Sequence, residues 1–290
     1  MGGRRTRPYG IQTLLIMKYP VVLTIAGSDS CGGAGVQADI KAISATGSYA
    51  ASAITAVTVQ NTLGVQAVHN VPVDIVKGQI EAVVSDIGAD AIKIGMLSSA
   101  ELVLAVRDSI GSLGVENIVL DPVMVSTSGH TLLASDAIGV LASQLAPLAR
   151  VVTPNIPEAQ ILLGEKITDQ NELPSTARAL SEKLSSRGRK VSVLMKAGHL
   201  EDERLVDYFY NAEEDHVVPL ESSRVHSPNT HGTGCTLSSA LASYLAQGFG
   251  LDEAARRAKD YIARAIEDGA SYTIGHGHGP VNHFWMLKRR

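Results

Sequence analysis

The sequence predicts an α/β protein with a mostly parallel central sheet between two layers of helices. Short apolar, β-branched segments alternate with segments of helical periodicity along nearly the whole chain, as in strands joined by helical crossovers. The residues are 45% hydrophobic but only 4% aromatic, so the core is expected to consist mainly of Ala, Val, Ile and Leu. Because a three-layer unit of about 250 residues can hold one continuous core, we expect a single domain over residues 18–290.

The strands and helices are predicted from their apolar patterns. The uninterrupted β-branched run at residues 21–26 is typical of a buried parallel strand, and similar runs lie at residues 52–59, 91–94, 118–120, 150–153 and 191–196. Three later segments favour antiparallel strands at residues 204–210, 215–220 and 224–226. Helices are predicted between the strands at residues 34–45, 73–86, 99–112, 136–145, 172–186, 234–247 and 252–268. The polar and glycine-rich motifs then follow strands or begin helices, at the edge where such sheets bind ligands.

The amino-terminal residues have some features of an export signal. Basic residues at positions 4, 5 and 7 precede an apolar run at residues 11–17, but Lys18 follows at once and no small-residue cleavage site is present. We therefore expect residues 1–17 to be a disordered extension. Two cysteines cannot build a disulfide framework, which favours the cytoplasm. A net charge of −4 gives no reason to expect nucleic-acid or membrane binding.

The most informative motif is the segment N-T-H-G-T-G-C-T at residues 229–236, which precedes an apolar helical run. Small residues at a helix start leave backbone N–H groups free to bind an anion, and the helix dipole adds positive potential. Gly232, Thr233 and Gly234 are therefore expected to hold phosphate. The same field should favour the thiolate of Cys235, which makes it a catalytic candidate. The alternative is a helix-capping turn with a cysteine that only packs.

A second glycine-rich loop, G-S-D-S-C-G-G-A-G, occupies residues 27–35 after the first strand. Residues 33–38 fit the loose dinucleotide pattern G-x-G-x-x-A, but they lie too far past the strand for a tight turn. The second strand also ends in Val59-Gln60-Asn61 instead of an acid. The chain contains no G-x-x-x-x-G-K-[ST] segment, so a P-loop is excluded.

These two loops belong to a series of motifs that is specific in combination. The series reads A-G-S-D at 26–29, G-G-A-G-V-Q-A-D at 32–39, K-I-G-M-L at 93–97, L-D-P-V-M at 120–124, T-P-N-I-P-E at 153–158, M-K-A-G-H-L at 195–200 and H-G-T-G-C-T at 231–236. In this order, over residues 18–285, the series resembles the hydroxymethylpyrimidine/phosphomethylpyrimidine kinases of thiamine biosynthesis, in the ribokinase superfamily. The resemblance implies a ribokinase-like three-layer α/β/α sandwich, ATP and Mg²⁺, a small-molecule pyrimidine substrate and a homodimer.

The resemblance also implies roles around the phosphates. Asn155 and Glu158 match the superfamily's N-x-x-E element, expected to hold Mg²⁺, and Asp121 resembles an acid near the metal. From spacing alone, a helix cap formed by Asn155 and Glu158 is favoured over a metal site, and the resemblance reverses that preference. Lys196 follows a strand and would reach the transferring or β-phosphate, so it is expected to serve both catalysis and nucleotide binding. Most ribokinase relatives carry Asp where this chain has Cys235.

The resemblance places the pyrimidine beneath the first strand ends. The residues expected to line that pocket are Gly27, Asp39, Thr58, Gln60, Met96 and Val123. Asp39 and Gln60 would bond the ring nitrogens and the amino group. Gln60 stands where some relatives have Glu, and Thr58 where an aliphatic residue is common. A pyridoxal kinase and a catalytically idle binding protein are the alternatives. The histidine-containing tail at residues 275–284 is expected to border the adenine pocket and not to bind zinc.

Overall fold

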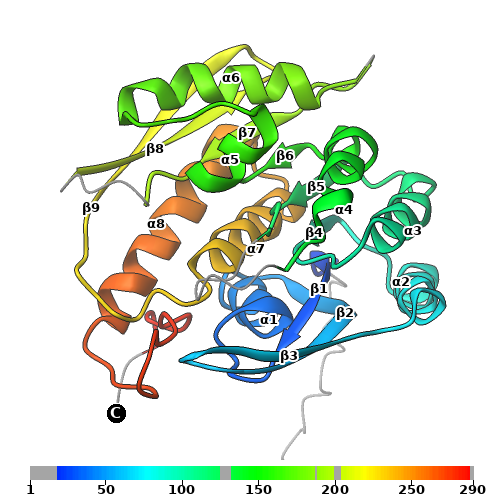
Figure 1. Ribbon diagram of the computed structural model, residues 1–290, viewed down its shortest axis with the longest axis horizontal. Coiled ribbons are helices and arrows are strands. Elements are labelled where there is room, and N and C mark those ends of the chain that lie inside the picture. Colours follow the sequence, from blue (N-terminus) through cyan, green and yellow to red (C-terminus); the bar gives the residue numbers. More distant parts are fainter. Residues whose placement is uncertain (1–17, 125–131, 187, 199–203, 288–290) are drawn as a thin grey trace, which may run out of the picture.

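The structure, a computed structural model, describes residues 18–124, 132–186, 188–198 and 204–287 (Figure 1). The expected extension at residues 1–17 lies outside these residues. Over the described part of the chain, one nine-stranded sheet has the order β3-β2-β1-β4-β5-β6-β7-β8-β9. The strands are β1 Val21–Asp29, β2 Tyr49–Asn61, β3 Gly64–Asn70, β4 Ala91–Ile94, β5 Asn117–Leu120, β6 Val151–Val152, β7 Ser192–Met195, β8 Arg204–Asn211 and β9 His216–Ser223.

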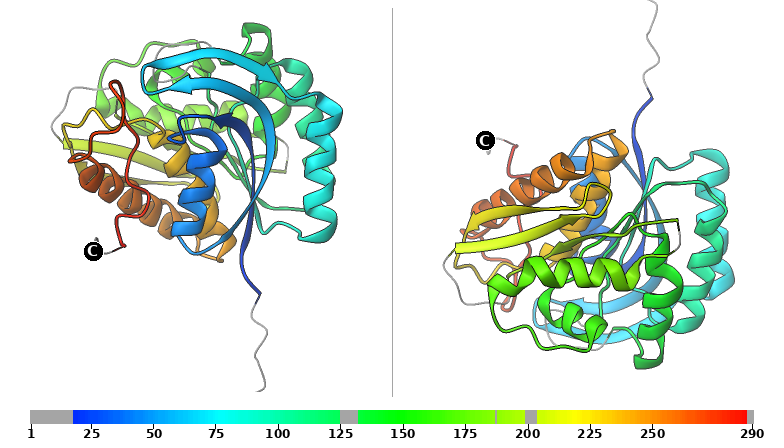
Figure 2. Two further views of the ribbon diagram at one scale, coloured as in Figure 1. Left: turned by 90° about the horizontal axis from the view of Figure 1, so that it is seen from below. Right: turned by 90° about the horizontal axis from the view of Figure 1, so that it is seen from above.

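Helices cover both faces of this sheet. The helices are α1 Gly35–Ala45, α2 Val73–Asp86, α3 Ala100–Gly111, α4 Ser135–Val140, α5 Ile156–Leu163, α6 Leu173–Leu184, α7 Thr233–Ala246 and α8 Leu251–Gly269. Short helical turns at Leu141–Leu145, Ala146–Leu148 and Gln170–Glu172 complete them. In Figures 1 and 2, α1, α7 and α8 lie on one face, and α2 and α3 lie on the other. The α/β/α sandwich and mostly parallel sheet predicted from the sequence are thereby confirmed.

The two layers enclose separate apolar cores. Ile43 of α1 and Leu241 of α7 pack with Val22 of β1 in one core. Val76 of α2 and Val103 of α3 belong to the other. Alternate residues of the central strands thus contribute to opposite cores, which explains why these strands are apolar throughout.

Strand order determines where a ligand can bind. Strand β1 pairs in parallel with β2 on one side and with β4 on the other, so the direction of progression along the sheet reverses at β1. Open α/β sheets bind ligands at this reversal, beyond the carboxyl ends of the strands. The loops after β1, β4, β5, β6 and β7 meet at this edge.

Three parts of the element prediction are wrong. Strand β3, which pairs antiparallel with β2, was not predicted; its residues are mostly exposed, and the segment lacks the strong apolar run of a buried strand. No strand forms at residues 224–226, because β9 continues to Ser223 and pairs with β8 alone. Helix α5 at Ile156–Leu163 was not among the predicted helices, whereas the helix predicted at 136–145 forms as α4 followed by a π-helical turn.

Candidate active site

The start of α7 forms an open glycine-rich turn. Gly232 has φ of 79°, which favours glycine, and no side chain caps the helix. Any Cβ atom on Gly232 would overlap the carbonyl oxygen of Gly33 in the loop after β1. The turn is therefore packed against the first loop, and residues 232–235 line the cavity at an uncapped helix start, which suits an anion.

Cys235 lies in the first turn of α7, where its sulfur accepts a hydrogen bond from the Gly35 N–H. Burial raises the pKa of this thiol to about 11, although nearby Lys93 lowers it in part. The expectation of a thiolate is therefore wrong: removal from water outweighs the favourable field, and the group is a neutral thiol near pH 7.

A lysine and two carboxylates face the same cavity. Lys196 Nζ lies 2.9 Å from Asp121 Oδ1 and 3.9 Å from Glu158 Oε2. Burial alone would raise the pKa of Asp121, but Lys196 and Lys93 hold it below its ordinary value. Glu158 is different, because burial raises its pKa to about 7 despite Lys196. The three charged residues predicted for the site, Asp121, Glu158 and Lys196, thus lie together beyond the ends of β5, β6 and β7.

Asn155 and Glu158 also form the helix cap that was the alternative interpretation. The Asn155 carboxamide oxygen accepts the Glu158 N–H at 2.9 Å, and Glu158 Oε2 accepts the Asn155 N–H at 2.8 Å. Both residues still line the cavity. The cap therefore fixes the Glu158 carboxylate at the cavity wall and occupies the Asn155 oxygen that was expected to hold the metal.

The cavity has a volume of about 600 Å³ and runs from the β1 loop to α8. Of the predicted pocket residues, those that line it are Gly27, Thr58, Gln60, Met96 and Val123. Thr58 Oγ1 donates to the Ser28 carbonyl oxygen at 3.0 Å. Met96 lies against Gly27, where a Cβ atom would come within 3.1 Å of the Met96 sulfur.

Asp39 does not reach the cavity surface. Its side chain has no exposed area, and its carboxylate accepts hydrogen bonds from Lys93, Thr24 and Ser239. The prediction that Asp39 contacts the pyrimidine directly is therefore wrong in this conformation. Because it ends the motif at residues 32–39, its position on α1 was predicted, but the inward direction of its side chain was not.

The tail is placed differently from the prediction as well. The N–H groups of His276 and Gly277 donate to Thr62 Oγ1 at the β2–β3 turn, and no residue of 275–284 lines the cavity. The tail does contact His231 of the cavity wall, since the Gly279 carbonyl oxygen accepts the His231 backbone N–H at 3.0 Å, so that a border with the adenine pocket stays a prediction. Within the described residues, the side-chain groups close enough to hold a metal are Asp29 with Cys31 and His231, and Glu214 with His216 and Asp252. Neither includes a tail histidine.

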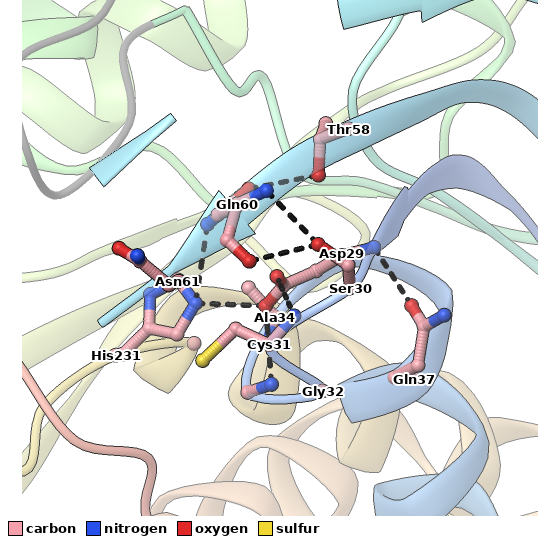
Figure 3. Close-up of polar contacts among 12 residues, drawn as sticks. Asp29, Ser30, Cys31, Gly32, Ala34, Gln37, Thr58, Gln60, Asn61 and His231 are labelled. Carbon is pink, nitrogen blue, oxygen red and sulfur yellow. Dashed lines mark hydrogen bonds and ion pairs between the residues drawn. The ribbon is translucent and has the colours of Figure 1, made fainter. Parts of the chain in front are cut away.

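Three site residues were missed at the sequence level: Asp29, His231 and Lys93. His231 Nε2 lies 2.8 Å from Asp29 Oδ2 and so joins the glycine-rich turn at residues 232–235, which we call the cradle, to the end of β1 (Figure 3). Both residues stand inside the quoted motifs, but nothing in their spacing indicates a bond. Lys93 could have been found, because a lysine within the apolar strand Ala91–Ile94 requires a buried partner.

Together, the sheet and the site define a ribokinase-like α/β protein with an uncapped, glycine-rich helix start beside buried carboxylates. The sequence profile of the phosphomethylpyrimidine kinase family matches residues 29–282, and the chain belongs to this family.

The relatives include kinases of two vitamins. The chain is 47% identical over 265 residues to hydroxymethylpyrimidine/phosphomethylpyrimidine kinase from Rhizobium meliloti, covering 91% of this chain and 97% of that one. A crystal structure of phosphomethylpyrimidine kinase from Clostridium difficile is 43% identical, with a TM-score of 0.71, and the match covers 85% and 99% of the two chains. Pyridoxal kinase from Bacillus subtilis, in an ADP complex, is 33% identical with a TM-score of 0.83, covering 92% and 98%. The chain spans about half the length of other relatives, which are bifunctional thiamine biosynthesis proteins.

Proposed function

We propose that this protein transfers the γ-phosphoryl group of ATP to the hydroxymethyl oxygen of 4-amino-5-hydroxymethyl-2-methylpyrimidine, and then a second one to the resulting monophosphate. The observation that carries the proposal is the meeting, in one cavity, of an uncapped helix start with Lys196, Asp121 and Glu158. Phosphoryl transfer depends mainly on positioning the reactants and neutralising phosphoryl oxygens. The relatives named for this activity support the choice of acceptor.

The cradle and Lys196 provide the neutralisation. N–H groups of Gly232–Cys235 would bond the transferring phosphoryl oxygens, and Lys196 would contact the β- or γ-phosphate. A Cβ atom on Gly234 would lie 3.3 Å from Lys196 Nζ, so glycine keeps this approach open. The neutral Cys235 thiol would hydrogen-bond the acceptor hydroxyl. It need not remove the proton early, because the transition state is loose.

The carboxylates fit Mg²⁺. Glu158 is buried, and its raised pKa shows that Lys196 does not fully compensate its charge. A divalent cation would supply that compensation, and Mg²⁺ prefers such oxygen ligands. We propose that Glu158 and Asp121 hold the ion, directly or through water, while Asn155 orients Glu158. When bound, Mg²⁺ neutralises charge on the nucleotide phosphates.

The acceptor would occupy the end of the cavity near β1 and β2. Met96 and Val123 offer apolar contact to the ring, and Gln60 offers an amide to its polar edge. The other end is lined by Val225, Ile262 and Ile266, an apolar surface suited to the adenine of ATP.

Pyridoxal kinase is the second candidate function. Pyridoxal kinase structures from Bacillus subtilis and Staphylococcus aureus superpose with TM-scores of 0.83 and 0.82, at 33% and 31% identity. The higher identity to pyrimidine kinases favours the first function. An ADP-release assay with the hydroxymethylpyrimidine, its monophosphate, pyridoxal and no acceptor tests both. We expect rapid release with both pyrimidines; release with pyridoxal alone would reverse the assignment.

We further propose a homodimer in the cytoplasm. Val57 and Val59 project from the outer face of β2, with 48% and 55% of their surface exposed, and a second copy could cover them. Both cysteines, Cys31 and Cys235, are unpaired thiols, as a reducing compartment allows. Among the described residues, no helix has the length and apolar character needed to cross a membrane. Sedimentation at micromolar concentration distinguishes dimer from monomer.

A further inference from the structure

The end of β1 and the loop before α7 are joined by a network centred on Asp29 (Figure 3). The Asp29 carboxylate accepts hydrogen bonds from the N–H groups of Cys31, Gly33 and Ala34 at 2.8, 3.1 and 2.8 Å. His231 Nε2 lies 2.8 Å from the same carboxylate. Both side chains are buried. The Asp29 carboxylate therefore accepts three N–H groups of the first loop and also contacts His231, the residue before Gly232.

Close packing makes this junction rigid. A Cβ atom on Gly33 would overlap the His231 ring, and one on Gly232 would overlap the Gly33 carbonyl oxygen. The backbone N–H of His231 also donates a hydrogen bond to the carbonyl oxygen of Gly279 at 3.0 Å. His231 therefore cannot turn away from Asp29 without separating the cradle from the first loop.

The proton on His231 can be assigned by counting donors. Burial alone would raise the pKa of Asp29, but the hydrogen bonds from His231 and the loop N–H groups lower it. The carboxylate is thus ionised and can only accept. His231 Nε2 must carry the hydrogen. A metal ion at this nitrogen would have to replace that hydrogen and compete for a carboxylate that already accepts four bonds.

The side chain of Gln60, on β2, also lies close to His231 Nε2. Gln60 Nε2 lies 3.3 Å from His231 Nε2, and Gln60 Oε1 lies 3.1 Å from Thr58 Oγ1. The single Thr58 hydroxyl hydrogen is used on Ser28 O. Because His231 Nε2 carries a hydrogen, it cannot accept one from Gln60 Nε2. These groups are all satisfied when the two ends of the Gln60 amide are exchanged, so that its oxygen faces the His231 Nε2–H and its NH₂ faces Thr58 Oγ1. The choice between the two amide orientations follows from the network.

We propose that His231 is a positioning residue that links the acceptor pocket to the phosphate cradle. Through Asp29 it fixes the cradle against the first loop, and through its shared N–H it sets the orientation of the Gln60 amide. The inference rests on the proposed function in assigning Gln60 to the acceptor and residues 232–235 to phosphate. It adds a residue of the cavity wall whose role is to determine how the two binding surfaces face each other.

His231→Phe tests this link, because phenylalanine keeps a ring but lacks the N–H donor. We expect kcat to fall about 10²-fold, since misplacement by roughly 1 Å has effects of this size. The KM for ATP should change less than threefold, because the loss falls on the transition state. His231→Gln retains an N–H donor and should recover most of the turnover. His231→Leu serves the same comparison if the phenyl ring prevents folding.

His283 provides a matched control. It is also buried and also contacts α7, with Nε2 3.0 Å from Thr236 Oγ1, but it does not touch Asp29 or Gln60. His283→Phe should reduce stability without a comparable loss of kcat per folded molecule. Equal losses of kcat in the two phenylalanine variants would reduce His231 to a general packing residue and overturn the proposal.

Amide hydrogen exchange gives a readout that does not require activity. In the protein without ligands, the segment 28–36 should exchange faster in His231→Phe than in the parent, because the Asp29 network loses one of its bonds. Unchanged exchange there, or turnover within twofold of the parent, would overturn the proposal. If segment 28–36 exchanges faster in the variant but the parent protein does not phosphorylate the pyrimidine, the proposed function is contradicted and the positioning role of His231 is not.

Discussion

Lys93 Nζ lies 2.8 and 2.9 Å from the two carboxylate oxygens of Asp39, and neither side chain has any exposed surface. The pair joins β4 to α1 beneath the cradle. Thr24 of β1 and Ser239 of α7 also donate to Asp39, at 2.6 and 2.7 Å. Although burial alone would lower the pKa of Lys93, Asp39 raises it. The Lys93–Asp39 ion pair, with the hydrogen bonds from Thr24 and Ser239, therefore holds β1, β4, α1 and α7 together beneath the site.

Removing one member of this pair should be severely destabilising. Asp39→Ala leaves the Lys93 ammonium buried without its counter-ion, and breaking a buried pair typically costs about 3–5 kcal/mol. Urea unfolding measures the loss. The matched control is Asp260→Ala, which breaks an exposed pair with Arg264 one helical turn away and should cost under about 1 kcal/mol. Comparable small losses in both variants would show that Lys93 finds another partner.

Glu158 is predicted to reduce stability at neutral pH in exchange for function. Burial raises its pKa to about 7 from 4.5, so the folded protein holds a proton that the unfolded chain has released between these values. Stability is therefore lost as pH rises through this window, by roughly 3 kcal/mol. Glu158→Gln should be more stable than the parent at pH 8, with the difference shrinking toward pH 5.

The same variant should require more Mg²⁺ for half-maximal rate, since it loses a proposed ligand. Urea titrations at pH 5 and pH 8 test the stability, with Glu182→Gln on the exposed face of α6 as the control. A Glu158→Gln protein that is no more stable than the parent at pH 8, or has an unchanged Mg²⁺ dependence, would contradict this interpretation.

Cys235→Ala should lower kcat while retaining the fold and ATP binding. Loss of a proton-transfer group typically reduces rates about 10²–10⁴-fold, and we expect the lower end because the thiol is neutral. With its pKa raised to about 11 by burial, Cys235 should add no inflection to the rate profile between pH 6 and 9. Cys31→Ala, outside the cavity lining, is the control. Turnover of Cys235→Ala within twofold of the parent would leave the thiol a packing role only.

Gln60 is expected to contribute to acceptor choice. Gln60→Leu removes the amide that would bond the aminopyrimidine, and an unpaired buried polar group costs about 1–3 kcal/mol. The value of kcat/KM should fall about tenfold for the pyrimidine and less for pyridoxal, which lacks the amino group. Steady-state kinetics with both acceptors tests this. Equal losses for the two acceptors would place Gln60 outside the specificity determinants.

The fold was largely predictable because its strands are buried on both faces and its motifs mark strand ends. The run at Val21–Asp29 and the small residues before α7 carry their structural signal locally. The edge strand β3 lacks that signal. The direction of a side chain also cannot be predicted from the neighbouring sequence. Helix α1 was predicted, but Asp39 points away from the cavity because β4 places Lys93 beside it. The neutral state of Cys235 likewise depends on its burial, which the spacing of the motif does not reveal.

The most direct test of the account is a competition between the two acceptors. Equal concentrations of hydroxymethylpyrimidine and pyridoxal are incubated with limiting ATP and Mg²⁺, and both phosphorylated products are measured by mass spectrometry. The initial product ratio equals the ratio of kcat/KM values. The account predicts at least about tenfold more pyrimidine phosphate, the lower part of the range for one unmatched polar group. Equal amounts, or an excess of pyridoxal phosphate, would contradict it.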